Sequence, residues 1–148
     1  METTVSLVQM LDARERRVQH QQELLARYHK PLICFTMNIC GPVKDSPLIR
    51  RGFARGCQLL RQQFLRAKLV PLREDAIREV TGCEAFYVLD ADPLTIKKFT
   101  TDIEDATPLG RLFDMDVIRP DGRKVDREEL QLAGRRCLIC GGPAKVCS

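Results

Sequence analysis

Two aspartates, Asp114 and Asp116, stand inside the apolar run LGRLFDMDVI at 109–118. Side chains alternate between the two faces of a β-strand, so both carboxylates point to one face, with Cα atoms roughly 6.5–7 Å apart. Paired carboxylates on a rigid strand are ligands that suit Mg²⁺ or Mn²⁺. The alternative is two solvated acids near a strand end. Because unpaired charges are costly to bury, the apolar setting favours a metal site.

A metal pair of this kind usually needs a third carboxylate, and the chain offers two candidates. Glu104 lies on the predicted helix that leads into Gly110, and it is our first candidate. Asp90, at the end of a neighbouring predicted strand, is the second. An exposed helix position explains Glu104 equally well.

The segment CGPVKDSP at 40–47 joins a predicted strand to a predicted helix. Backbone N–H groups at a helix N-terminus can bind phosphate, and Lys44, Arg50 and Arg51 would add positive charge. Against this, the segment holds two prolines, which lack an N–H, and an aspartate, which repels anions. It is not a Walker loop, because GxxxxGK[ST] is absent. Phosphate binding and a plain connection therefore remain equal alternatives.

A cysteine-rich end suggests a second kind of site. Cys137, Cys140 and Cys147 could supply three of four zinc ligands, with the fourth missing nearby. Reduced thiols without a role are the alternative, as expected for the other four cysteines. The two histidines, His20 and His29, are expected on a helix surface, so histidine catalysis is not predicted.

The elements that must position these residues follow from local signals. Asp12 and Glu15 have the spacing of a capping box and predict the first helix, with Val18, Leu24 and Leu25 towards the core. The predicted elements, in order, are a helix over 12–29, a strand over 32–39, a helix capped by Ser46 with Pro47 in its first turn, a short helix over 74–80, a strand over 84–90, a helix over 92–106, a strand over 111–119, a turn at 120–122 and a helical turn near Asp126.

These elements predict one domain over 1–148 of the α/β or α+β class, with a small mixed sheet covered by helices and a cysteine-rich segment at 135–148. The composition, 44% hydrophobic and 30% charged, is that of a globular chain. No stretch is long and apolar enough to span a bilayer, and no secretory signal is apparent. Seven cysteines without an export signal predict reduced thiols in a cytoplasm.

Charge is distributed unevenly around a net value of +4. Lysine and arginine greatly outnumber acids over 14–73, and the balance reverses over 74–110. A basic half beside an acidic half could bind an anionic ligand next to a carboxylate-bound metal. Solvation of opposite faces is the alternative.

Five motifs occur together in one order, and they carry a family resemblance: RERRxxxQ (14–21), FTxNxxGPxKDS (35–46), RRxFxxG (50–56), PLGRLFDxDV (108–117) and RRCLxC (135–140). Together they resemble the apo-citrate lyase phosphoribosyl-dephospho-CoA transferases, also called holo-citrate lyase synthases, over nearly the whole chain. A helix, a glycine and a strand bearing Asp-x-Asp also resemble the metal-ligand arrangement of polymerase-β-type nucleotidyltransferases. A nucleotidyltransferase-like fold is therefore expected.

The resemblance implies a reaction. The 2′-(5″-phosphoribosyl)-3′-dephospho-CoA group would pass from its triphosphoribosyl donor to a serine of the acyl carrier subunit of citrate lyase, and pyrophosphate would leave. Asp114 and Asp116 would hold Mg²⁺ or Mn²⁺, and Glu104 could activate the serine. The candidate substrate-binding residues are Lys44, Lys97, Arg111, Arg14, Arg17, Asn38, Arg50 and Arg51.

Two other functions remain as alternatives. A related enzyme uses the same donor to load the malonate decarboxylase carrier protein. A basic zinc-knuckle module that binds nucleic acid is the alternative from another class. Aromatic residues are only 5% and no nucleic-acid motif is present, so neither nucleic acid nor membrane is expected as a partner.

Overall fold

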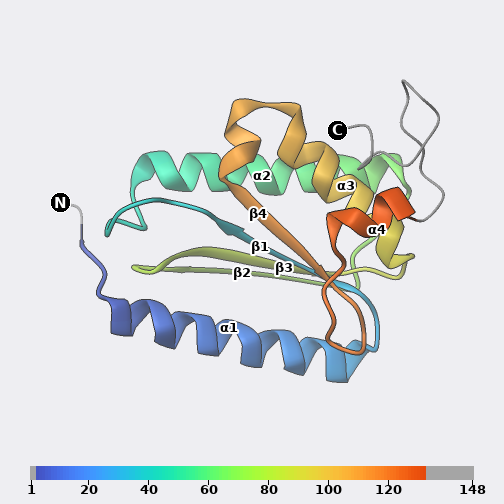
Figure 1. The fold of residues 1–148 in the computed structure, drawn as a ribbon, viewed down its shortest axis with the longest axis horizontal. Helices are drawn as coiled ribbons and strands as arrows, with labels where there is room; N and C mark the ends of the chain where they lie inside the picture. The colour runs from blue at the N-terminus through green and yellow to red at the C-terminus, as the bar shows by residue number, and fades with distance from the viewer. Residues whose placement is uncertain (1–2, 133–148) are drawn as a thin grey trace.

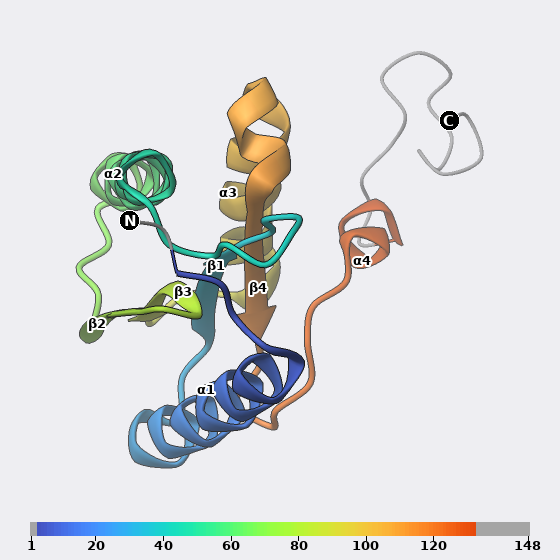
Figure 2. The same ribbon diagram turned by 90° about the vertical axis from the view of Figure 1, so that its left-hand side faces the viewer.

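The protein forms three layers, with a four-stranded sheet between one helix and a pair of helices (Figures 1 and 2). The computed structural model describes residues 3–132. Helix α1 (Leu7–Tyr28) covers one face of the sheet, and helices α2 (Pro47–Arg66) and α3 (Pro93–Ala106) cover the other. The remaining elements are β1 (Leu32–Met37), β2 (Arg73–Glu79), β3 (Gly82–Val88), the 3-10 helix η1 (Pro108–Leu112), β4 (Phe113–Ile118) and α4 (Arg127–Leu132).

The sheet has the strand order β2-β3-β1-β4 and is antiparallel at every pairing. The α+β class and the covering helices are as predicted, but the expectation of a mixed sheet is wrong. The strands that the sequence predicts already pair antiparallel with one another, and segment 74–80, expected as a short helix, forms most of a further strand, β2. It forms a hairpin with β3, turning where Gly82 has a φ of +124°, a conformation that favours glycine.

Helix α1 begins earlier than predicted. Ser6 caps it by accepting a hydrogen bond from the Gln9 N–H at 3.2 Å, and the Gln9 side chain accepts one from the Ser6 N–H at 2.8 Å. The capping box therefore lies at Ser6 and Gln9, and Asp12 lies inside the helix. Leu24 and Leu25 are buried as expected, but Val18 is 47% exposed.

Helices α2 and α3 begin where their caps predict. Ser46 and Asp92 each accept a hydrogen bond from a backbone N–H in the first turn, and a proline follows each of them. The buried residues of α2 recur at helical spacing: Phe53, Gly56, Cys57, Leu60 and Phe64. The turn at 120–122 and the helical turn after Asp126 are also present.

Two hydrophobic cores result, one on each face of the sheet. The larger one lies under α2 and α3 and includes Phe35, Leu60 and Tyr87. The smaller one joins Leu24 and Leu25 of α1 to a patch of sheet residues around Leu32 and Phe86. That patch covers only one end of the sheet, so the other end of the α1 face is free to carry polar residues.

Candidate functional site

Cross-strand rows explain why polar residues gather under α1. The pairing aligns Asp114, Thr36, Glu84 and Ile77 across β4, β1, β3 and β2. The next row aligns Asp116, Cys34, Phe86 and Asp75, and the third aligns Ile118, Leu32, Val88 and Arg73. Neighbouring strands lie about 4.8 Å apart, so the first row spans roughly 14 Å. The sheet therefore changes from apolar to polar along α1.

Asp114 and Asp116 lie on this one face, as the alternation of β4 predicts. Burial raises the pKa of Asp114, and the carboxylates of Asp116 and Glu104 raise it further, while Lys124 acts in the opposite direction. Lys124 places its Nζ 3.2 Å from an Asp116 carboxylate oxygen. Like charges are thus held close together at the edge of the sheet, where a cation would relieve their repulsion.

Glu104 stands beside this pair but has its own partners. One carboxylate oxygen accepts a hydrogen bond from the Met115 N–H at 3.0 Å, and the other lies 2.8 Å from Arg127. The geometry therefore favours a role in holding β4 over that of a third metal ligand. Asp90 is remote, because it follows Val88 at the opposite end of the sheet from Asp114, and it pairs with Lys30 at 3.2 Å.

Arg14 and Arg17 of α1, together with Asn38 and Lys44 from the segment after β1, share one cleft with Asp114. The cleft has a volume of about 170 Å³. Its other lining residues are Met10, Thr36, Met37, Ile39, Ile49, Thr81, Gly82, Cys83 and Glu84. Three positive side chains thus line a small concavity together with the carboxylates of Asp114 and Glu84, a setting that suits a phosphate chain with a bound cation.

Side-chain contacts fix two of these cations. Arg17 donates a hydrogen bond to Glu84 at 2.8 Å, and both side chains are largely buried. The Lys44 ammonium donates to the Ile39 carbonyl oxygen. The Asn38 backbone N–H donates to Leu112 at 2.7 Å, which ties the segment after β1 to the turn before β4. The cleft is therefore built before any ligand enters.

Four predicted substrate-binding residues lie outside this cleft. Lys97 is buried on α3, on the far side of the sheet, and Arg111 is exposed on η1. Arg51 is exposed on α2. Arg50 binds Asp45 through two hydrogen bonds of 2.8 and 2.7 Å, which lower the pKa of that carboxyl. The predicted zinc ligands Cys137, Cys140 and Cys147 lie outside the described residues.

Sequence reasoning missed Glu84 and misplaced His20. Glu84 becomes visible as a cleft residue only through the pairing of β3 with β1. His20 was expected on the helix surface, but it lies partly buried against the sheet, with Nε2 2.8 Å from Asp75 and its ring 4.5 Å from that of Phe86. Its position at helical spacing from Leu24 was the available signal. His29 is exposed, as predicted.

The acidic pair fits a magnesium ion in part. Within residues 3–132, no three Asp, Glu, His or Cys side chains are placed to hold a metal together. Magnesium in phosphoryl-transfer sites is commonly bound by one or two carboxylates, with substrate phosphates and water as the other ligands. Asp114 and Asp116 match that smaller ligand set.

No helix in the described part of the chain is long and apolar enough to cross a membrane.

Comparison with known proteins gives one consistent family. The family model described as apo-citrate lyase phosphoribosyl-dephospho-CoA transferase matches residues 5–148. The protein of that name from Citrobacter koseri is 35% identical over 144 residues, which cover 97% of this chain and 79% of that protein. "Protein CitXG" of Haemophilus influenzae is also 35% identical over 144 residues, but the chain spans only 31% of its length.

Proposed function

The chain belongs to the apo-citrate lyase phosphoribosyl-dephospho-CoA transferase family, and on that premise we propose the reaction that it catalyses. It transfers the phosphoribosyl-dephospho-CoA group from the triphosphoribosyl donor to a serine of the citrate lyase acyl carrier subunit. Pyrophosphate is released. One observation carries the proposal: the cleft under α1 is lined by Asp114 together with Arg14, Arg17 and Lys44.

The proposed reaction is a single displacement at phosphorus. The serine Oγ attacks the α-phosphorus of the donor and forms a phosphodiester. The bond from the α-phosphorus to the oxygen that bridges to the β-phosphorus breaks, and that oxygen leaves with pyrophosphate. Such a transfer needs positioning and charge neutralisation more than covalent chemistry by the enzyme.

The basic residues of the cleft would bind the phosphates. Lys44 and Arg14 supply positive charge from two sides, and Arg17 is oriented by its pairing with Glu84. Asp114 and Asp116 would hold Mg²⁺ or Mn²⁺, which would supply positive charge to the α-phosphate and to the departing pyrophosphate.

Glu104 is our candidate to accept the serine proton. It is close enough to Asp114 to raise the pKa of that carboxyl. Its Oε1 atom is held by Arg127, whose side chain is half exposed and could move away from it. Glu104 would therefore act only when this ion pair opens.

The test is a loading assay read by mass spectrometry. The protein is incubated with synthetic donor, Mg²⁺ and the apo-carrier of citrate lyase, and in a parallel reaction with the apo-carrier of malonate decarboxylase. The expected result is a mass gain of one phosphoribosyl-dephospho-CoA group on the citrate lyase carrier. Loading of the malonate decarboxylase carrier alone would assign the other acceptor, and loading of neither would refute the transfer.

A further inference from the structure

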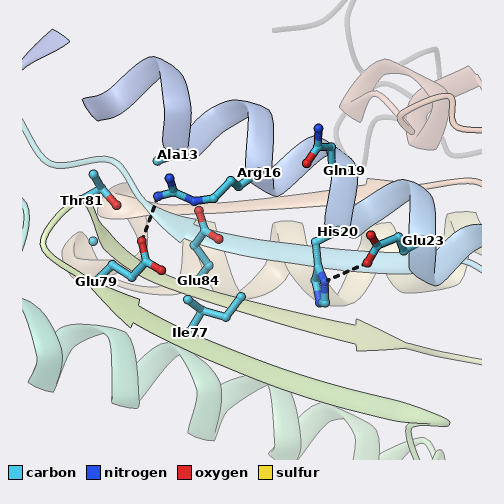
Figure 3. A pocket seen from close by; sticks show the side chains of 10 residues that line it. Ala13, Arg16, Gln19, His20, Glu23, Ile77, Glu79, Thr81 and Glu84 are labelled. Carbon is cyan, nitrogen blue, oxygen red and sulfur yellow. Dashed lines mark hydrogen bonds and ion pairs between the residues drawn. The ribbon is translucent and has the colours of Figure 1, made fainter. Parts of the chain in front are cut away.

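A second cavity adjoins the basic cleft under α1. It has a volume of about 220 Å³ and lies between α1 and the β2–β3 hairpin. Thr81, Gly82 and Glu84 line both cavities, so the two share a wall. In Figure 3, Ile77 and Glu84 lie on the strands below α1. The first cross-strand row therefore leads from Asp114 in one cavity to Ile77 in the other.

The charges of this second cavity disfavour a phosphate. Its one cationic lining residue, Arg16, lies 2.9 Å from Glu79 (Figure 3). Glu23 and Glu84 add two further carboxylates to the lining. An anion placed there would meet the carboxylate of Glu23 and two ion pairs, Arg16 with Glu79 and Arg17 with Glu84, whereas the neighbouring cleft adds Arg14 and Lys44 to the shared Arg17–Glu84 pair. The two adjoining cavities thus differ: the basic cleft suits an anion, and the second cavity suits an uncharged group.

The remaining lining suits a flat, polar-edged ring. Ala13 and Ile77 provide apolar surface. His20 forms a wall whose orientation is fixed by Asp75 at 2.8 Å and by edge-on packing against Phe86. At the rim, the Gln19 amide and the Thr81 hydroxyl can both donate and accept hydrogen bonds, as the edge of a purine requires.

We propose that this cavity binds the purine base of the donor while the basic cleft holds its phosphates. The inference rests on the proposed function, in which the donor carries adenine and a triphosphate at opposite ends of two linked riboses. A base in one cavity and a phosphate chain in the next would place the riboses over the shared wall. The cross-strand row from Asp114 to Ile77 is roughly 14 Å long, which leaves room for the phosphate chain, the riboses and the base to lie along it in that sequence.

Nuclear magnetic resonance can locate the base directly. The probe is 3′-dephospho-CoA, which carries the base but no triphosphate, added to the full chain with labelled methyl groups. The expected result is nuclear Overhauser contacts from the adenine protons to the methyl groups of Ala13 and Ile77. Contacts to Met37 and Ile49 of the basic cleft instead, or no binding at millimolar probe, would overturn the proposal.

A matched pair of variants separates binding from helix stability. Gln19→Ala removes a cavity-lining amide, and Gln22→Ala removes an exposed amide of the same helix that does not line the cavity. Gln19→Ala should weaken 3′-dephospho-CoA binding about fivefold, as loss of a hydrogen bond predicts, and leave inorganic tripolyphosphate binding unchanged. Gln22→Ala should change neither. Equal effects of both variants, or none from Gln19→Ala, would refute the assignment.

The outcomes also distinguish this inference from the proposed function. Loading of the carrier, combined with adenine contacts to Met37 and Ile49, would overturn the base site alone. Adenine contacts to Ile77 without loading of either carrier would refute the transfer and support a nucleotide-binding site.

Discussion

Asp114 carries the strongest electrostatic conflict of the acidic site. Burial and repulsion by the carboxylates of Asp116 and Glu104 raise the pKa of Asp114, and attraction to Lys124 lowers it. The folded chain therefore holds this proton to a higher pH than the unfolded chain does. Raising the pH through the interval between the ordinary and the raised pKa lowers the free energy of unfolding, because the unfolded state binds fewer protons there.

Asp114→Asn should accordingly stabilise the protein in a pH-dependent way. Without divalent ions, the melting temperature of the variant should exceed that of the wild type at pH 7. The difference should shrink as the pH falls through the interval from the raised to the ordinary aspartate pKa, and it should vanish below that interval, because Asp114 is then neutral in both states. Thermal unfolding across this range provides the measurement. A difference that grows towards acid pH would contradict the described environment of Asp114.

The ion pair between Arg17 and Glu84 makes a separate prediction. Glu84→Gln keeps the shape of the side chain but removes the charge that orients Arg17. The donor KM should rise about fivefold while kcat stays within about twofold, as expected when ground-state binding is weakened. Steady-state loading kinetics test this. Glu74→Gln, at a loosely paired and exposed position on β2, is the matched control and should change neither parameter.

At the scale of elements, the turn between α3 and β4 positions the aspartates. A Cβ at Gly110 would lie 2.4 Å from the Glu104 carbonyl oxygen and 2.6 Å from that of Ile103. The backbone of η1 therefore packs directly on the end of α3. This contact sets where β4 starts and so where Asp114 projects.

Gly110→Ala should therefore destabilise the fold, by about 2 kcal/mol or more, because backbone atoms must move. Gly52→Ala is the matched control, since its Cβ would meet side chains alone, the end of the flexible Met37 side chain at 3.2 Å and Leu109 at an ordinary contact distance of 3.6 Å. Alanine is also preferred inside a helix, so the control should change stability by less than about 1 kcal/mol. Chemical denaturation distinguishes the two. Equal effects would contradict the close packing at Gly110.

The sequence predicted an element correctly where the signal lay in a few adjacent residues and did not depend on distant segments. The caps of α2 and α3 could be read from a Ser-Pro and an Asp-Pro pair. Strand β2 was mistaken for a helix because its segment, REDAIRE, is mostly charged, and its burial depends on α1 and β3. The start of α1 was misplaced because Asp12 and Glu15 repeat inside the helix the spacing of its true cap.

At the scale of the whole molecule, the cleft depends on contacts between distant segments. The alternation within β4 was enough to predict that Asp114 and Asp116 share a face. Arg14 and Arg17 were among eight substrate-binding candidates, but only the packing of α1 over the sheet separates them from the candidates that lie elsewhere, such as Arg51 and Arg111. Lys97 was also predicted to bind substrate, but it does not reach the cleft, because helix α3 lies on the face of the sheet opposite α1.

The proposed transfer depends on the acidic pair, Asp114 and Asp116, acting beside the basic cleft. The most direct test compares single-turnover loading of the citrate lyase apo-carrier by the wild type and by Asp116→Asn, with saturating donor and Mg²⁺. Asp102→Asn, on the exposed side of α3, is the matched control. The account predicts that Asp116→Asn folds normally and loads the carrier at least about 100-fold more slowly, while the control loads normally. A folded Asp116→Asn variant that loads the carrier at a near-wild-type rate would contradict it.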